Sequence, residues 1–168
     1  NIGLCLVDND ISYAGAKLLA VAIGKLDKLT NIGLDLGNNK INNDGAGSLA
    51  VAILKLVNLT SLYLNLVDND INNFGARYLA FAIGKLGKLE KIGLYLGNNE
   101  ITYDGVEYLV GAIEKNKNLT DISFNTGFLD IDKKINNREF EDLKKMFLKY
   151  YKEEQQQQQM QQQQLQQN

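Results

Sequence analysis

Hydrophobic positions recur along the chain in four blocks of equal length, which start at residues 1, 31, 61 and 91. Leucine or isoleucine occupies the same places in each block, and an asparagine and a glycine recur between them. The second block illustrates the shared positions, which are Ile32, Leu34, Leu36, Asn39, Ile41, Gly45, Leu49, Ala52, Ile53 and Leu59. Chance does not produce such regular spacing, so we expect four copies of one structural unit.

Each block contains two hydrophobic periods. From Ile32 to Leu36 apolar residues alternate with other residues, which predicts a strand. From Ala46 to Leu56 apolar residues fall three and four positions apart, which predicts a helix. Asn43 or Asp44 is suited to cap the start of that helix. Each unit is therefore predicted to be a strand, a turn, a helix and a return segment.

Units of this kind bury their apolar faces only when they stack, because one strand and one helix share too small a core. Neighbouring strands lie ~4.8 Å apart, whereas a helix with its side chains is ~10 Å across. The helix side of the stack must therefore be wider than the strand side. We predict a curved α/β solenoid with a parallel sheet on its concave side and helices on its convex side.

The asparagine column lies where each predicted strand ends and its backbone groups lose their partners in the sheet. A buried asparagine side chain can bond to those groups and to the turn of the next repeat. We therefore predict a structural ladder rather than a ligand site, formed by Asn9, Asn39, Asn69 and Asn99.

These columns resemble the leucine-rich repeat, whose core pattern is L-x-x-L-x-L-x-x-N-x-L. In this chain the pattern stands as Leu29-x-x-Ile32-x-Leu34-x-Leu36-x-x-Asn39-x-Ile41. The glycine and the helical half look most like the ribonuclease-inhibitor-like subclass, and an additional x-Leu pair lengthens the repeat. The resemblance covers residues 1 to about 151. It implies the fold, whereas its implications for function are broad because this fold hosts many binding roles.

The fifth block, from residue 121, keeps the strand positions and then changes character. Glu139 replaces the glycine, and the helical half carries the bulkier apolar residues Phe140, Leu143, Met146 and Phe147. We predict that this block is the C-terminal cap of a leucine-rich repeat domain spanning residues 1–151. Residues 152–168 form a Gln-rich low-complexity tail. Its glutamine tract, residues 155–168, cannot bury a core, so we expect disorder there, with extension of the last helix by a turn or two as the alternative.

The first predicted strand would leave one sheet edge open, whereas a natural solenoid needs a cap there. We therefore expect the chain to be a fragment of a longer protein. The uncapped first strand and the Gln-rich tail are also the two places where we predict weak self-association.

The composition of the chain argues against several kinds of partner and several kinds of catalytic chemistry. The net charge of −2 argues against nucleic acid, which needs a basic surface. No apolar run approaches the ~18 residues that would indicate a membrane span. Cys5 is the only cysteine and there is no histidine, so a reducing, cytoplasmic location is expected and the commonest general base is missing.

No motif for catalysis, a metal or a cofactor stands out, so we predict none of the three. Acidic residues do gather in the first and third turns, at Asp8, Asp10, Asp68 and Asp70. Alternate strands lie ~10 Å apart, however, whereas calcium ligands lie ~2.4 Å from the ion. Solvated turns are the simpler interpretation.

Residues that point outward from the predicted strands vary between blocks and form the candidate binding site, namely Asp35, Tyr63, Asn65, Tyr95, Ser123 and Asn125. Tyrosine is enriched at protein interfaces, although these tyrosines could equally cover the sheet between small neighbours. Five strands offer a face of roughly 350 Å², less than the ~800 Å² per partner of a standard interface.

The chain is thus predicted to be a protein-interaction module that binds a macromolecular partner through its concave strand face, without catalysis of its own. The alternative is the regulatory or targeting region of a larger enzyme, because similar repeats are sometimes fused to an upstream protein kinase domain.

Overall fold

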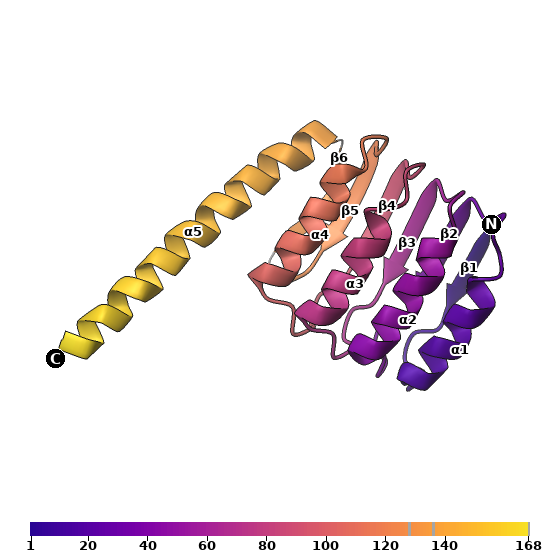
Figure 1. Ribbon diagram of the computed structural model, residues 1–168, viewed down its shortest axis with the longest axis horizontal. Helices are drawn as coiled ribbons and strands as arrows, with labels where there is room; N and C mark the ends of the chain where they lie inside the picture. Colours follow the sequence, from indigo (N-terminus) through magenta and orange to yellow (C-terminus); the bar gives the residue numbers. More distant parts are fainter. Residues whose placement is uncertain (128, 136, 168) are drawn as a thin grey trace.

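In the computed structural model, which describes residues 1–127, 129–135 and 137–167, strands and helices alternate along the chain (Figure 1). The elements follow in the order β1 (Ile2–Cys5), α1 (Tyr13–Ile23), β2 (Asn31–Asp35), α2 (Asn42–Lys55), β3 (Ser61–Asn65), α3 (Asn73–Ile83), β4 (Lys91–Tyr95), α4 (Tyr103–Lys115), β5 (Asp121–Asn125), β6 (Asp130–Ile135) and α5 (Asn137–Gln167). Helices α1 to α4 lie side by side along one face of the sheet. We call this side the helix face and the opposite side of the sheet the strand face.

The sheet has its six strands in chain order, and β1 to β5 pair in parallel. Residues at the same place in successive repeats face each other across every parallel pair, so Leu34 lies opposite Leu64 and Leu64 opposite Leu94. Each column of the sequence repeat thereby becomes a ladder across the sheet. The predicted α/β solenoid is confirmed.

The repeated apolar residues form one continuous core between the sheet and the helices. The leucine ladder at Leu34, Leu64 and Leu94 has no exposed surface. Leu4, in the same column, is partly exposed, because β1 pairs only with β2 within the described sheet. Burial in the middle of the stack therefore comes from neighbouring units, as expected for a repeat protein.

The glycine column lets adjacent helices approach at their first turns. A Cβ added to Gly45 would lie 2.5 Å from Cγ2 of Ile41 and 3.1 Å from Cβ of Ala16 in the preceding helix. A larger residue would collide first with the isoleucine four positions earlier in its own repeat and then with the preceding helix, which explains why glycine recurs at this position.

The helix starts differ from the sequence prediction. The side chain of Asn42, rather than Asn43 or Asp44, accepts a hydrogen bond from the backbone N–H of Asp44, at 2.9 Å. Asn43 instead points to the following repeat, where its Oδ1 accepts from the N–H groups of Asn72 (2.9 Å) and Gly75 (3.0 Å). The prediction that Asn43 or Asp44 caps its own helix is wrong, because the start of the next helix lies within reach of Asn43.

Turns after the strands alternate with a period of two repeats. One position in every turn has a positive φ, between 52° and 58°, at Asp8, Asn38, Asp68 and Asn98. Asp and Asn tolerate this left-handed region better than other non-glycine residues. Asp10 and Asp70 share it, with φ of 50° and 55°, whereas the equivalent Lys40 and Glu100 form bridges to the preceding repeat. Residues two repeats apart are thus the closest structural equivalents.

The last unit departs from the repeat. Strand β6 runs antiparallel to β5, which the sequence analysis did not predict. In α5, Phe140 and Phe147 are buried as expected, and the ring of Phe140 meets that of Phe124 edge-on. Met146, which belongs to the same apolar pattern, is by contrast 68% exposed.

Helix α5 continues through the Gln-rich segment to Gln167 and extends beyond the rest of the molecule (Figure 1). The expectation of disorder from residue 155 is therefore wrong, and the helix continues further than the turn or two of the alternative. Glutamine has a good helix propensity, and the docked first half of α5 removes the cost of starting a new helix. Among the described residues, no helix combines the length and the apolar character needed to cross a bilayer.

Candidate functional site

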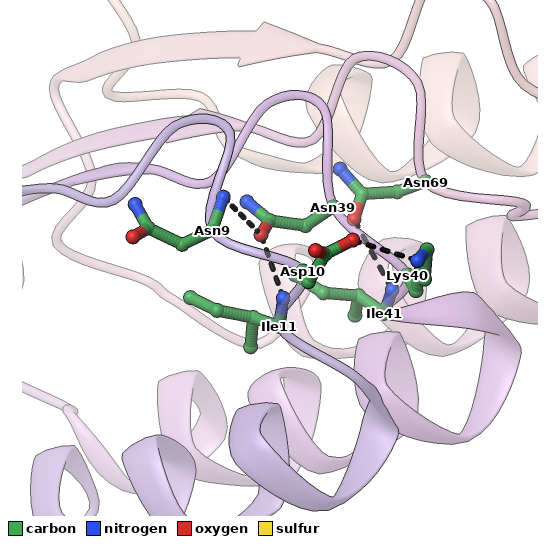
Figure 2. Close-up of polar contacts among 7 residues, drawn as sticks. All are labelled: Asn9, Asp10, Ile11, Asn39, Lys40, Ile41 and Asn69. Atoms are coloured by element: carbon green, nitrogen blue, oxygen red, sulfur yellow. Dashed lines mark hydrogen bonds and ion pairs between the residues drawn. The ribbon is translucent and has the colours of Figure 1, made fainter.

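Asparagine side chains join each turn to its neighbour at the edge where the strands end. The Oδ1 atom of Asn39 accepts hydrogen bonds from the backbone N–H groups of Asn9 (3.1 Å) and Ile11 (2.8 Å), as Figure 2 shows. Its Nδ2 atom donates to the carbonyl oxygens of Leu6 (2.9 Å) and Leu36 (3.0 Å). One side chain thus serves its own turn and that of the preceding repeat, whereas the sequence analysis expected the next repeat.

The same arrangement recurs at Asn69 and Asn99. Asn69 accepts from the N–H of Ile41 and donates to the carbonyl of Leu36, at 3.2 and 2.8 Å, and its side chain is fully buried. Asn99 accepts from the N–H groups of Asn69 and Ile71, at 3.1 and 2.9 Å. The described hydrogen bonds occupy both ends of these amides, so none is presented to a ligand.

Asp10 and Lys40 form an exposed ion pair beside this ladder, with 2.6 Å between Oδ1 and Nζ (Figure 2). The hydrogen bond and charge of Lys40 hold the pKa of the Asp10 carboxyl below its usual value, and Asp10 correspondingly raises the pKa of Lys40. The carboxylate of Asp10 is therefore already paired with the ammonium group of Lys40. Within the described part of the chain, no group of three or more acidic, cysteine or histidine residues is placed to hold a metal ion.

Two tyrosines meet on the strand face. The ring centroids of Tyr63 and Tyr95 lie 5.4 Å apart at an angle of 47°, and Tyr63 remains 40% exposed. The two rings lie over Gly93, where an added Cβ would come within 3.0 Å of Tyr63 and 3.4 Å of Tyr95. Burial raises the pKa of the Tyr63 phenol, and the nearby Asp35 raises it further.

A shallow groove of about 270 Å³ lies beside the tyrosines, across β3, β4 and β5. Its lining includes Ser61, Tyr63, Lys91, Gly93, Tyr95, Asp121 and Ser123. The structure thus brings Tyr63, Tyr95 and Ser123 of the predicted set together. Three further lining residues were not predicted from the sequence, although the strand alternation places all of them on the same face, namely Ser61, Lys91 and Asp121.

The remaining predicted residues, Asp35, Asn65 and Asn125, lie at the strand ends and bend toward their own turns. In each case Oδ1 accepts a hydrogen bond from the backbone N–H two residues further along the chain, at 3.4, 3.0 and 3.2 Å respectively. Asn65 also donates to Asp35, at 2.8 Å. These polar groups shape the end of the strand face, and their hydrogen bonds to the backbone limit what they offer to a partner.

A family model described as leucine-rich repeat matches residues 34–50 of the chain. The match covers the end of β2, the turn with Asn39 and the first half of α2. No curated protein matches the chain. The match and the repeated strand–helix units together support a leucine-rich repeat protein.

Domains of leucine-rich repeat proteins generally mediate protein–protein interaction and usually act as binding modules rather than enzymes. In this chain, the aromatic groove on the strand face is the candidate site of such an interaction. Its assignment to the ribonuclease-inhibitor-like subclass stays a prediction.

The two predicted places of self-association lie at opposite ends of the stack of repeats. Strand β1 pairs with β2 and leaves Leu4 partly exposed, whereas the tail is part of α5, which exposes Met160. Self-association through either end stays a prediction.

Proposed function

We propose that this leucine-rich repeat protein is an interaction module that binds a protein partner through its strand face, without catalysis of its own. The observation that carries the proposal is the pair of contacting tyrosines, Tyr63 and Tyr95, beside a groove on an otherwise regular sheet.

Aromatic side chains next to a groove are typical anchors of protein interfaces, because their large rings contact a partner at a low cost in side-chain entropy. Tyr63 is held by Tyr95 and by the sheet at Gly93, so its position is set before a partner arrives. The groove of about 270 Å³ is smaller than most sites for whole small molecules. It suits one or two side chains of a protein partner better.

The charged groups around the groove add selectivity to this proposal. Lys91 and Asp121 line the same groove from β4 and β5, so the rim carries both signs of charge. We therefore place the main contacts at Tyr63, Tyr95 and Ser123. Asp35, Asn65 and Asn125 contribute by shaping the rim through their turns.

The experiment begins with a photoreactive phenylalanine analogue at position 63, used to trap a partner from a cell extract and identify it by mass spectrometry. The same analogue at Val57, an exposed residue of a return segment, is the matched control. Binding of the purified partner is then compared between the unmodified chain and the variants Tyr63→Ala, Tyr95→Ala and Tyr13→Ala.

We expect each substitution on the strand face to weaken binding at least about tenfold, the effect of losing an aromatic anchor. Tyr13→Ala, which changes a tyrosine that is 53% exposed at the start of α1, should leave binding unchanged. Equal affinities for all three variants would show that the strand face is not the site.

A further inference from the structure

The helix face carries two grooves that occupy equivalent places two repeats apart. The first, of about 200 Å³, lies between α1 and α2, and the second, of similar volume, lies between α3 and α4. Alanines line both grooves at matching positions, Ala20 and Ala52 in the first and Ala80 and Ala112 in the second. The two-repeat period of the turns thus extends to the helix face.

The groove between α1 and α2 is apolar in its middle and basic at its ends. Val21 and Val51 form its walls and are 54% and 57% exposed. Lys17 lies at one end and Lys55 at the other. Neither lysine has a hydrogen bond or an ion pair with another described residue. Exposed valines between two unpaired cations leave both apolar surface and positive charge open to a ligand.

Between the other helices, aromatic side chains stand at the positions equivalent to this groove. Between α2 and α3, the ring of Tyr78 lies against Gly47, where an added Cβ would be 3.1 Å from Cδ2 of the tyrosine. Between α3 and α4, the guanidinium of Arg77 lies 5.7 Å from the centre of the Tyr108 ring. Ser48 stands at the equivalent position in the first groove and is too small to cover it. Of these two grooves, the one between α1 and α2 has no aromatic ring in its lining, whereas Phe81 and Tyr108 line the other.

We propose that this groove binds a short amphipathic helix that has apolar residues in the middle of one face and an acidic residue at each end. Apolar walls on a floor of small residues are how proteins accept a helix in a groove. The unpaired Lys17 and Lys55 set the sign of charge at both ends of the bound helix. A flat lipid surface would not fill a groove between two helices, so a helical peptide fits better.

The spacing of the two lysines predicts the ligand's pattern. Lys55 stands at the same position of its repeat as Lys25, which lies eight residues after Lys17. Because a helix rises about 1.5 Å per residue, Lys17 and Lys55 lie at heights about 12 Å apart along the helix axis. On the ligand, residues seven or eight positions apart span this distance on one face. The predicted pattern is an acidic residue, apolar residues three and four positions later, and a second acidic residue at position seven or eight. This surface is separate from the strand face and does not depend on the function proposed there.

The test uses an 18-residue synthetic peptide with this pattern of glutamates and leucines, and a scrambled peptide of the same composition. Each is titrated into the full ¹⁵N-labelled chain, and backbone amide shifts are followed by NMR. We expect the patterned peptide to shift the amides around Lys17, Val21, Val51 and Lys55 in a saturable way, and the scrambled peptide to bind at least about tenfold more weakly.

Matched variants distinguish the contribution of the lysine charges to peptide binding from that of the apolar groove wall. Lys17→Glu and Lys55→Glu should each weaken binding of the peptide about tenfold, whereas Lys28→Glu, the same change outside the groove, should alter it less than about twofold. Val51→Asp should abolish the saturable shifts, whereas Val57→Asp, at 60% exposure, should not. Circular dichroism and the melting temperature establish that each variant folds.

Three outcomes would overturn the proposal. The first is an absence of saturable shifts at millimolar peptide, and the second is equal binding of the patterned and scrambled peptides. The third is binding of vesicles that contain phosphatidylserine, abolished by Lys17→Glu and Lys55→Glu, without any binding of the peptide. That result would assign the groove to a membrane surface instead.

Discussion

Polar side chains on the two sides of the solenoid differ in whether they bond to the protein itself. Along the strand ends and turns, Asn39, Asn69 and Asn65 bond to backbone groups within 3.2 Å. On the helix face, Lys17 and Lys55 have no bonded partner among the described residues. The reason is the backbone, because a strand that ends leaves N–H and C=O groups to be satisfied, whereas a helix satisfies its own except at its ends.

This difference changes how a candidate surface should be interpreted. Asp35, Asn65 and Asn125 point outward in the strand pattern, yet their oxygen atoms accept hydrogen bonds from their own turns. Lys17 and Lys55 of the helix face belong to no recognisable motif in the sequence, yet both are left without a bonded partner among the described residues. Substitutions on the two sides should therefore have different effects on stability and on binding.

Asn69→Ala should cause the largest loss of stability, about 3 kcal/mol, because it leaves several buried backbone groups without a partner. Asn9→Ala changes the same column in the first repeat, where the side chain is exposed and donates to the carbonyl of Val7. It should cost less than about 1 kcal/mol. Urea denaturation measures both, and equal losses would contradict the ladder's role in the interior of the stack.

Asn65→Ala should cost about 1 kcal/mol, because the N–H of Val67 and the carboxylate of Asp35 each lose a hydrogen bond. The double variant Asp35→Asn, Asn65→Asp exchanges the two groups and keeps every acceptor. Its urea midpoint should lie close to that of the unmodified chain. A double variant as unstable as Asn65→Ala would show that these side chains do more than form turns.

Lys17→Ala should change the free energy of unfolding by no more than about 0.5 kcal/mol, because the lysine is unpaired on the surface. The same variant should bind the acidic peptide of the groove test more weakly. A loss of stability above about 1 kcal/mol would mean that Lys17 supports the fold, and the contrast between the two faces would then fail.

The exposed pair of Asp10 and Lys40 should have the smallest effect. Because Lys40 lowers the pKa of Asp10 in the folded state, the pair contributes stability above the unfolded pKa of the aspartate and loses it as the pH falls through the folded value. NMR titration of the Asp10 carboxyl should show its pKa rising in Lys40→Met and with added salt. Lys17→Met is the control and should leave the titration unchanged.

Much of the fold could be predicted because the repeated apolar positions of the sequence are the positions that the fold buries. Apolar residues recur every two positions in the strand that contains Leu34 and every three or four positions in the helix that contains Ile53. Both residues are buried. The constant length of the repeat also determines the register, because identical units stack with equivalent residues opposite each other.

The candidate site could be predicted only in part. Alternation along the strands placed Tyr63, Tyr95 and Ser123 on one face, and the structure brings them to one groove. The same pattern could not show that Asp35 bends toward its own turn, because that choice depends on the backbone at the end of the strand.

The repeating unit, its register and its continuous core follow from the amino-acid sequence, because side-chain periodicity is a local property. The tertiary structure was needed to show that Asn39 bonds to the preceding repeat and that Asn43 caps the following helix. It was also needed to show that Lys17 and Lys55, beside the groove between α1 and α2, have no bonded partner among the described residues. The first two depend on atoms that lie about one full repeat apart in the chain. The third depends on which charged groups of neighbouring elements come within reach of each lysine, and a pattern along one chain segment carries no information about that.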